Sequence, residues 1–143
     1  MTGDFRLHGS CVARQGAGVV LLGPPGAGKS DLALRLLARG FDLVADDQVL
    51  VRDGRARAPA PLAGLLEVRG LGIVRLPMAR HARIVLAVML GAADRLPEPA
   101  RHPQLGVPLV HILAGSPSAP ERVALALDCA LGRVAQVAGA FAA

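Results

Sequence analysis

The stretch Gly23–Ser30 reads Gly-Pro-Pro-Gly-Ala-Gly-Lys-Ser and matches the pattern G-x-x-x-x-G-K-[ST] at every position. Glycines in such a loop let the backbone turn its N–H groups inward, where they can donate to phosphate oxygens. The lysine of the pattern reaches the β- and γ-phosphates, and the hydroxyl of the last residue can ligate Mg²⁺. We therefore expect a nucleoside triphosphate to lie on all eight residues: Gly23, Pro24, Pro25, Gly26, Ala27, Gly28, Lys29 and Ser30.

The residues on either side of the loop agree with this interpretation. Val19–Leu22 is a short unbroken apolar run, typical of a strand buried on both faces. Lys29–Arg39 has apolar residues at helical spacing, and Gly40 follows where helices commonly end. A helix that begins at Lys29 also directs the positive end of its dipole at the loop. A chance glycine-rich turn would not require these flanks.

The composition of the chain fits one domain and includes a single lysine. The chain has 143 residues, which fits a single domain over 1–143, and 52% of them are hydrophobic, enough for a core. Fifteen of the sixteen basic residues are Arg, and the one Lys is Lys29. A compact ammonium on a flexible stem therefore stands only where the motif uses one. Coding bias with a chance exception is the alternative explanation.

Charge, cysteines and hydropathy limit the classes of function. The net charge of +5 is spread along the chain, which suits ATP and an acidic protein partner. With three Phe, no Trp and no Tyr, we expect no nucleic-acid partner, because no aromatic row can stack bases. Cys11 and Cys129 form neither a disulfide framework nor a zinc pattern. The longest clean apolar stretch, Ile84–Leu90, is too short to cross a bilayer, so we expect a cytoplasmic protein without a membrane partner.

The order of apolar runs and turns predicts an α/β domain in which hairpins surround a central sheet. The dipeptide Asp53-Gly54 is a strong signal for a two-residue hairpin turn. Helices are expected over Lys29–Arg39 and Pro120–Val137, and loops over Pro59–Gly64 and Leu96–Pro108. Strands are expected over Leu7–Val12, Val19–Leu22, Phe41–Ala45, Gln48–Arg52, Arg55–Ala58, Leu65–Val68, Gly70–Val74, Ile84–Leu90 and Val110–Leu113.

Two adjacent carboxylates, Asp46 and Asp47, end the first strand after the predicted helix. Ligands of open α/β sheets bind at the carboxyl ends of strands, which predicts that the pair lies beside the phosphates. One carboxylate could then support the metal while the other accepts a proton from a hydroxyl nucleophile. Only one helix and one strand separate the pair from Lys29, as in small kinases. The alternative is that either Asp only forms a cap or a turn.

Four segments together resemble the catalytic domain of bacterial HPr kinase/phosphorylase. They are His8-Gly9, the loop Gly23–Ser30, the run Leu43–Asp47, and Leu66–Ile73, which reads Leu-Glu-Val-Arg-Gly-Leu-Gly-Ile. The resemblance covers residues 7–96 and implies a short form without the family's N-terminal domain. It implies a P-loop NTPase-like core of the phosphoenolpyruvate carboxykinase type, a mixed sheet with hairpins, and a C-terminal helix.

The resemblance also implies an activity. The family uses ATP and Mg²⁺ to phosphorylate a serine of HPr, a small phosphocarrier protein of the sugar phosphotransferase system. It can reverse the reaction with inorganic phosphate, releasing pyrophosphate, and its members assemble as hexamers. Gly115–Pro120 does not reproduce the family's late loop, which is linked to the reverse reaction, so kinase activity is better supported than phosphorylase activity.

Site residues follow from the matching positions. Asp47 resembles the residue that takes the proton of the serine, and His8 resembles the active-site histidine. Arg95, in Asp94-Arg95-Leu96, resembles an arginine that contributes to the active site alongside Lys29. Ser30, Glu67 and Asp46 are the expected Mg²⁺ residues. His8 could instead be an ordinary strand histidine and Glu67 a surface charge.

Two other functions are compatible with the loop and the acidic pair. A small-molecule kinase of the shikimate or gluconate type would share both features, but the segment Leu66–Ile73 counts against it. A nucleotide-binding regulatory module without transferase activity would need only the loop.

Overall fold

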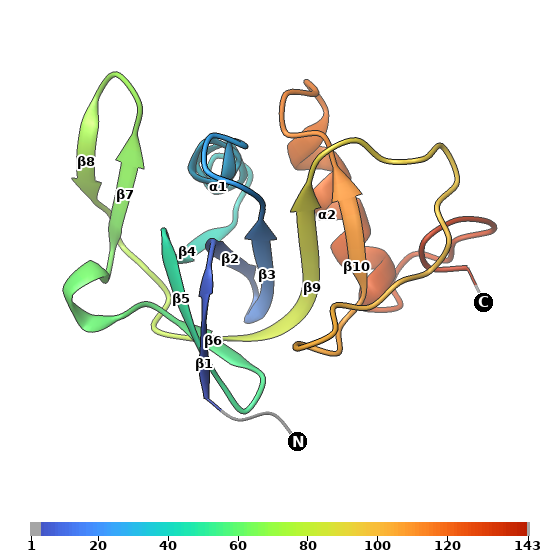
Figure 1. The fold of residues 1–143 in the computed structure, drawn as a ribbon, viewed down its shortest axis with the longest axis horizontal. Helices are drawn as coiled ribbons and strands as arrows, with labels where there is room; N and C mark the ends of the chain where they lie inside the picture. The colour runs from blue at the N-terminus through green and yellow to red at the C-terminus, as the bar shows by residue number, and fades with distance from the viewer. Residues whose placement is uncertain (1–3, 143) are drawn as a thin grey trace.

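The computed structural model describes residues 4–142 as a curved mixed sheet with two α-helices and a projecting hairpin (Figure 1). The helices are α1 (Lys29–Leu37) and α2 (Ala119–Ala130), and a 3₁₀ turn spans Ala60–Leu62. The strands are β1 (Phe5–His8), β2 (Ser10–Arg14), β3 (Ala17–Leu22), β4 (Asp42–Ala45), β5 (Gln48–Arg52), β6 (Arg55–Arg57), β7 (Leu65–Val68), β8 (Gly72–Arg75), β9 (Ala82–Leu90) and β10 (Leu109–Ile112).

Eight strands form the main sheet, in the order β1-β5-β6-β9-β3-β2-β4, with β10 also paired to β9. The long strand β9 is parallel to β3 along one edge; along the other it pairs with β6 near its start and with β10 near its end. Strand β2 is antiparallel to both β3 and β4, so β3 and β4 point in the same direction. Their carboxyl ends, which carry the phosphate loop and the acidic pair, therefore meet at one edge of the sheet.

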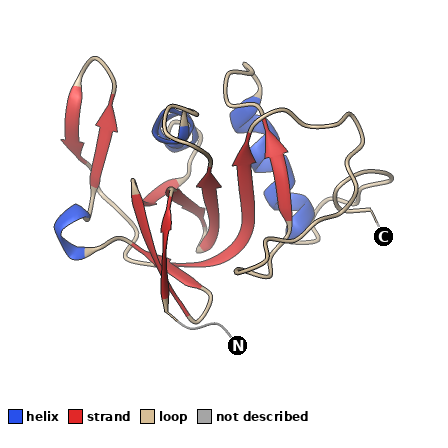
Figure 2. Ribbon diagram, viewed as in Figure 1, coloured by secondary structure: helices blue, strands red, loops and turns tan. Residues whose placement is uncertain are grey.

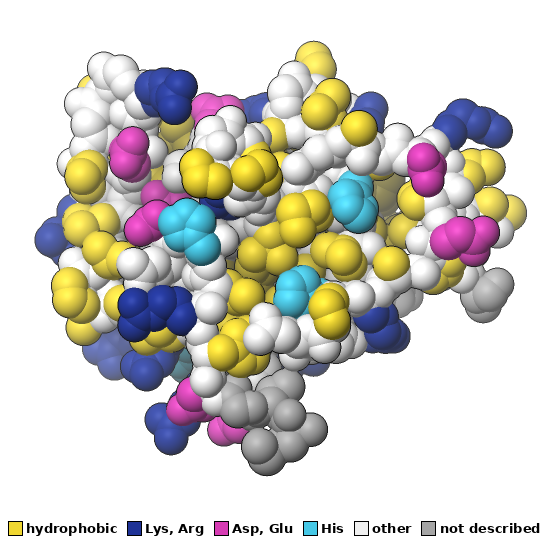
Figure 3. All heavy atoms as spheres, in the orientation of Figure 1, with side chains coloured by type: hydrophobic (Ala, Val, Ile, Leu, Met, Phe, Trp, Pro, Cys, Tyr) yellow, Lys and Arg dark blue, Asp and Glu magenta, His cyan; other side chains and the backbone are white. Residues whose placement is uncertain are grey.

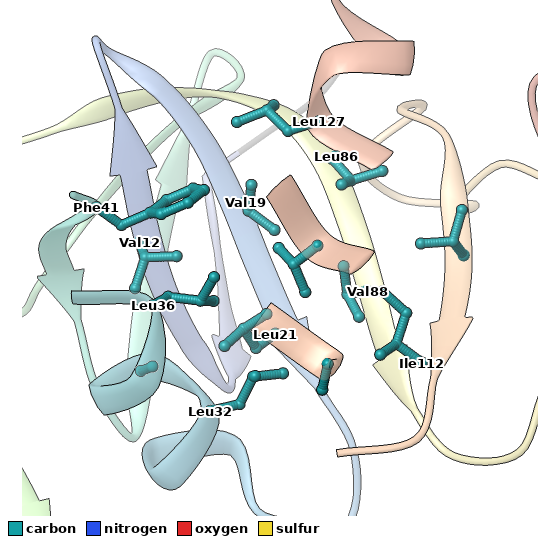
Figure 4. Packing of buried hydrophobic residues seen from close by; sticks show 14 of the residues in the cluster. Val12, Val19, Leu21, Leu32, Leu36, Phe41, Leu86, Val88, Ile112 and Leu127 are labelled. Atoms are coloured by element: carbon teal, nitrogen blue, oxygen red, sulfur yellow. The ribbon is translucent and has the colours of Figure 1, made fainter. Parts of the chain in front are cut away.

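Apolar side chains form a core on each face of this sheet. On one face, α1 and α2 pack against β3 and β9 through Val19, Leu21, Leu32, Leu36, Leu86, Val88 and Leu127 (Figures 2 and 4). On the other face, β5 and β6 fold over β2, β3 and β4, and their side chains Val49, Val51 and Ala56 are buried there. Strands β7 and β8 form a separate two-stranded arm beside the main sheet (Figure 1). Within residues 4–142, no helix has the length and apolarity needed to span a membrane.

Helix α1 begins at Lys29 as predicted and ends at Leu37, two residues earlier than predicted. Its apolar stripe, Leu32, Ala33 and Leu36, is buried against the sheet. Gly40 is left-handed (φ 91°), and its N–H donates to Leu37 O while the N–H of Phe41 donates to Leu36 O. A left-handed glycine that returns these two bonds to the last carbonyls is a common helix stop.

The prediction of one strand over Leu7–Val12 was wrong, because the chain changes partner at Gly9. Strand β1 pairs with β5, whereas β2 pairs with β3 and β4. Gly9 lies at the crossing, where an added Cβ would lie 2.6 Å from the carbonyl oxygen of Leu21. Its N–H donates to Asp47 O at 3.1 Å. Only glycine allows this close approach.

The predicted helix Pro120–Val137 was wrong in its extent, because α2 ends at Ala130. Gly132 is left-handed (φ 75°), its N–H donates to Cys129 O, and the N–H of Arg133 donates to Asp128 O. These two bonds make the same helix stop as in α1. Apolar periodicity continues past Gly132 in the sequence, which is why the spacing alone predicted a longer helix.

The other expected elements are present with smaller differences. Asp53 and Gly54 both have positive φ (52° and 75°), as the predicted two-residue hairpin turn requires. The turn between β7 and β8 spans Arg69–Leu71, so β8 begins at Gly72 rather than at the predicted Gly70. The loop Leu96–Pro108 contains neither a helix nor a strand, as expected.

Candidate active site

The phosphate loop joins the end of β3 to the start of α1. Gly23, Gly26 and Gly28 have φ values of 153°, 83° and 98°, in a region that other L-residues rarely adopt. At Gly28 an added Cβ would also lie 3.3 Å from the Cβ of Ala114. The loop is closed by an N–H···O bond from Ala27 to Pro24 at 3.1 Å. At Gly23 an added Cβ would lie 3.1 Å from the Cβ of Ala27. Glycine is therefore favoured by conformation at all three positions, and by packing as well at Gly23 and Gly28.

The Lys29 ammonium lies inside the loop that precedes it. Its Nζ donates to the carbonyl oxygens of Gly23 at 2.7 Å and Pro24 at 3.0 Å. These neutral carbonyls satisfy part of the hydrogen-bonding capacity of the ammonium, and no ion pair joins it to a carboxylate in the part of the chain that the structure describes. A phosphate oxygen would be a stronger, charge-assisted partner at the same place.

Asp46 is the centre of a buried hydrogen-bond network. Its Oδ1 accepts from the Ser10 hydroxyl at 2.7 Å, and the Ser30 hydroxyl lies 2.8 Å from Oδ1 and 3.0 Å from Oδ2. The backbone N–H of Glu67 donates to Oδ2 at 3.4 Å. The network joins β2, α1 and the β7–β8 arm to the end of β4. Asp46 is only 6% exposed, so these donors replace most of the water that its carboxylate would otherwise bind.

Ser10 is a site residue that the sequence reasoning missed. It is fully buried, lies at the start of β2, and lines the same cavity as the loop. The available signal was a hydroxyl residue directly before the apolar run Cys11–Ala13. A buried polar residue there needs a partner, and Asp46 is that partner.

Asp47 differs from its neighbour in exposure and backbone conformation. The N–H of Gln48 donates to Asp46 O at 2.8 Å, which places Asp47 at the centre of a three-residue turn with φ 69°. Its side chain is 60% exposed, and its Oδ1 lies 3.8 Å from Nδ1 of His8. That distance is too long for a hydrogen bond, but it is within ion-pair range for a protonated imidazole. The two carboxylates therefore differ: both oxygens of the buried Asp46 accept hydrogen bonds, whereas the Asp47 carboxylate is exposed.

A cavity of about 530 Å³ brings most of the predicted residues together. Figure 3 shows histidine and acidic side chains next to each other on this side of the molecule, between the arm and α1. The cavity is lined by His8, Ser10, Pro25, Gly26, Gly28, Lys29, Ser30, Asp31, Leu34, Asp47, Glu67, Val68 and Arg69. Arg95 is not among them, because it lies exposed on the loop that follows β9. The structure thus does not bring Arg95 to the other predicted residues.

The residues expected to hold Mg²⁺ fit that ion when it arrives with a triphosphate. No group of three or more His, Cys, Asp or Glu within residues 4–142 forms an all-protein metal cage. Mg²⁺ usually needs only one or two protein oxygens, because phosphates and waters supply the others. The Ser30 hydroxyl can donate its hydrogen bond to Asp46 while the lone pairs of its oxygen remain available to the ion. The Glu67 side chain lines the same cavity. Asp46, with both oxygens already bonded, supports Ser30 in this arrangement.

Comparison with known proteins agrees with the geometry. The sequence profile of the HPr Serine kinase C-terminal domain matches residues 1–88. The HPr kinase/phosphorylase of Cupriavidus necator is 36% identical over 143 residues, covering 87% of this chain and 44% of the relative. The enzyme of the same name from Clostridium tetani is 45% identical over 78 residues, covering 52% and 26%. The chain therefore spans less than half the length of these relatives.

A solved structure shares the fold. The Hpr(Ser) kinase/phosphatase from Coxiella burnetii superposes with a TM-score of 0.74 at 21% identity, covering 90% of this chain and 92% of that one. The matching profile covers the phosphate loop, the acidic pair and the arm, which are the segments that carried the resemblance in the sequence. The chain therefore belongs to the HPr serine kinase C-terminal domain family.

Proposed function

We propose that this chain transfers the γ-phosphate of ATP to a serine of an HPr-like phosphocarrier protein, on a core of the phosphoenolpyruvate carboxykinase type. The observation that carries the proposal is the division of the acidic pair. Asp46 is bonded to the last residue of the phosphate loop, and the neighbouring Asp47 is exposed in the same cavity. A nucleotide-binding module without catalysis would have no use for an exposed carboxylate in this cavity, whereas phosphate transfer to a hydroxyl needs a proton acceptor there.

Binding of the nucleotide is the task of the loop and α1. The loop N–H groups and the N-terminus of α1 are the donors for the phosphates, and Lys29 moves from loop carbonyls to the β- and γ-phosphates. Mg²⁺, held by Ser30 and Glu67 with support from Asp46, would neutralise charge that develops on the phosphates. Most of the rate enhancement then comes from positioning and electrostatics.

Asp47 is the proposed general base. The serine hydroxyl of the acceptor enters the open side of the cavity, and its proton passes to the Asp47 carboxylate as the new O–P bond forms. The bond between the γ-phosphorus and the β–γ bridging oxygen breaks, and ADP leaves. His8, 3.8 Å from Asp47, stabilises the carboxylate when the imidazole is protonated. In the reverse reaction an oxygen of inorganic phosphate attacks the phosphorus of phosphoserine and the serine O–P bond breaks. Asp47 passes the proton of the attacking phosphate to the serine oxygen, and pyrophosphate is released.

The remaining expectations extend this proposal. An oligomer, hexameric by family resemblance, and a cytoplasmic location stay predictions. The role of Arg95 also stays a prediction, and it requires that the loop after β9 reach the cavity when substrates are bound.

The test is incubation of the purified chain with Mg²⁺-ATP and an HPr-type protein, followed by mass spectrometry of the product. A phosphoserine on the acceptor supports the proposal. Parallel reactions contain a panel of small hydroxylated metabolites. ATP consumption with a metabolite alone would identify a small-molecule kinase, and ATP binding without turnover on any acceptor would identify a regulatory module.

A further inference from the structure

Four arginines project from one face of the three neighbouring strands β1, β5 and β6. Strand pairing aligns Arg6 of β1 with Leu50 of β5, and Leu50 with Arg57 of β6. One row further along, Arg52 of β5 is directly opposite Arg55 of β6. Residues directly opposite each other in an antiparallel pair share a face. We call Arg6, Arg52, Arg55 and Arg57 the arginine ladder.

The ladder faces away from the core. The residues between its members, Phe5, Leu7, Val49, Val51 and Ala56, pack into the second apolar cluster, so the arginines point to the opposite side. All four arginines are exposed, and Leu50 is half-buried between Arg6 and Arg57. A groove of about 270 Å³ along this face is lined by Arg6, Leu50, Arg52 and Arg57 together with three neighbours. Figure 3 shows basic side chains gathered at the lower left, in the region of β1, β5 and β6 in Figure 1.

The positive charge of the ladder is largely uncompensated. Within residues 4–142 its one ion pair joins Arg52 to Asp4 at 3.6 Å, with both side chains about two-thirds exposed (67% and 66%). Arg6 donates to the neutral amide oxygen of Gln48, and Arg55 contacts a ring nitrogen of His81. Like charges directly opposite each other destabilise a sheet, and Arg55 is also opposite Arg83 of β9. Such an arrangement favours a partner that supplies negative charge.

The ladder is continuous with the active site. His8, which lines the cavity, lies on the same face of β1 as Arg6 and pairs with Gln48. Two residues along a strand span about 7 Å, so the ladder begins about 7 Å from the His8 row and ends about 14 Å from it. A small metabolite in the cavity could not reach both rows. A protein acceptor could, because a typical interface covers about 800 Å² on each partner.

We propose that the arginine ladder docks an acidic surface of the acceptor protein while the acceptor's serine occupies the cavity. This inference rests on the proposed function, since it needs a protein acceptor. Leu50 would supply the apolar contact at the centre of the surface, and the arginines around it would set orientation and the rate of encounter. The surface determines which acceptor is phosphorylated without taking part in the chemistry.

The test compares the double variant Arg6→Gln/Arg57→Gln with the control Arg122→Gln/Arg133→Gln. The control removes the same charge from exposed positions on and just after α2. We expect the KM for an HPr-type acceptor to rise about tenfold in the first variant, since each exposed charge pair contributes about a twofold to fivefold effect. The kcat at saturating acceptor and the KM for ATP should not change, and the control should match the parent. Raising the salt concentration from 0.1 to 1 M should raise the acceptor KM of the parent chain toward that of the variant.

The outcomes separate the surface from the chemistry. If the parent chain phosphorylates the acceptor and both variants keep its KM, the ladder proposal is wrong and the proposed function stands. If the parent chain transfers phosphate to no protein, calorimetric titration with the HPr-type protein still tests the ladder. Binding weakened only in the Arg6→Gln/Arg57→Gln variant supports the surface, whereas absent or equal binding overturns it. The ladder proposal would also be overturned if the Arg6→Gln/Arg57→Gln variant bound the acceptor as the parent chain does but bound DNA more weakly than the parent chain.

Discussion

Replacement of Ser10 by Ala tests the network around Asp46. The Ser10 hydroxyl is fully buried and donates to the carboxylate at 2.7 Å, so the variant loses a buried hydrogen bond to a charged group. Such bonds contribute about 1.5–3 kcal/mol to the free energy of unfolding. A chain of this length should have a free energy of unfolding of about 7–20 kcal/mol, so the variant should remain folded. The expected loss corresponds to a decrease in Tm of about 5–10 °C.

The assay is urea unfolding of the parent chain, Ser10→Ala and the control Cys11→Ala. Cys11 is the next residue of β2, is equally buried, and belongs to the second apolar cluster, so its truncation costs packing without touching Asp46. The variant Asp46→Asn completes a double-mutant cycle. The effect of Ser10→Ala should shrink by at least about 1 kcal/mol in the Asp46→Asn background, because the bond there is no longer charge-assisted. An equal loss in both backgrounds, or a loss no larger than that of Cys11→Ala, would refute the reasoning.

Three further predictions concern the loop and the buried thiol. Gly28→Ala should lower the free energy of unfolding by about 1–2 kcal/mol and weaken ATP binding, because φ is 98° and the new methyl group would meet Ala114; urea unfolding and nucleotide titration measure the two effects. Lys29→Met should weaken ATP binding at least about tenfold with little change in Tm, because within residues 4–142 the ammonium bonds only to loop carbonyls; an unchanged Kd would contradict its assignment. Cys11 should resist a thiol reagent at pH 8 until the chain unfolds, because burial raises its pKa to about 12; rapid labelling of Cys11 in the folded protein would show that β2 opens.

Features set by neighbouring residues could be predicted from the sequence. The phosphate loop needs glycines at positive φ, and the hairpin turn at Asp53-Gly54 needs two residues that tolerate positive φ. Both signatures are local and therefore visible in sequence. The proximity of Asp46 to the loop was also predictable, because parallel strands bring their carboxyl ends to one edge.

Features set by long-range packing could not be predicted. The break at Gly9 results from the carbonyl of Leu21, which lies in a different strand. The helix stop at Gly132 competes with an apolar pattern that continues beyond it. Ser10 was missed because its importance depends on Asp46, thirty-six residues away along the chain. Arg95 matches the family pattern, but its position on an exposed loop depends on the path of the chain after β9.

The most direct test of the proposed mechanism is the rate of phosphate transfer by Asp47→Asn. The side chain is 60% exposed, and within residues 4–142 its one ion pair is with His8 rather than with the phosphate loop, so the variant should fold and bind Mg²⁺-ATP as the parent chain does. Loss of a general base should lower kcat for phosphorylation of the acceptor serine by about 10²–10⁴-fold. Transfer at a near-parental rate, with equal ATP binding, would contradict the assignment of Asp47 and the division of the acidic pair on which the proposed function rests.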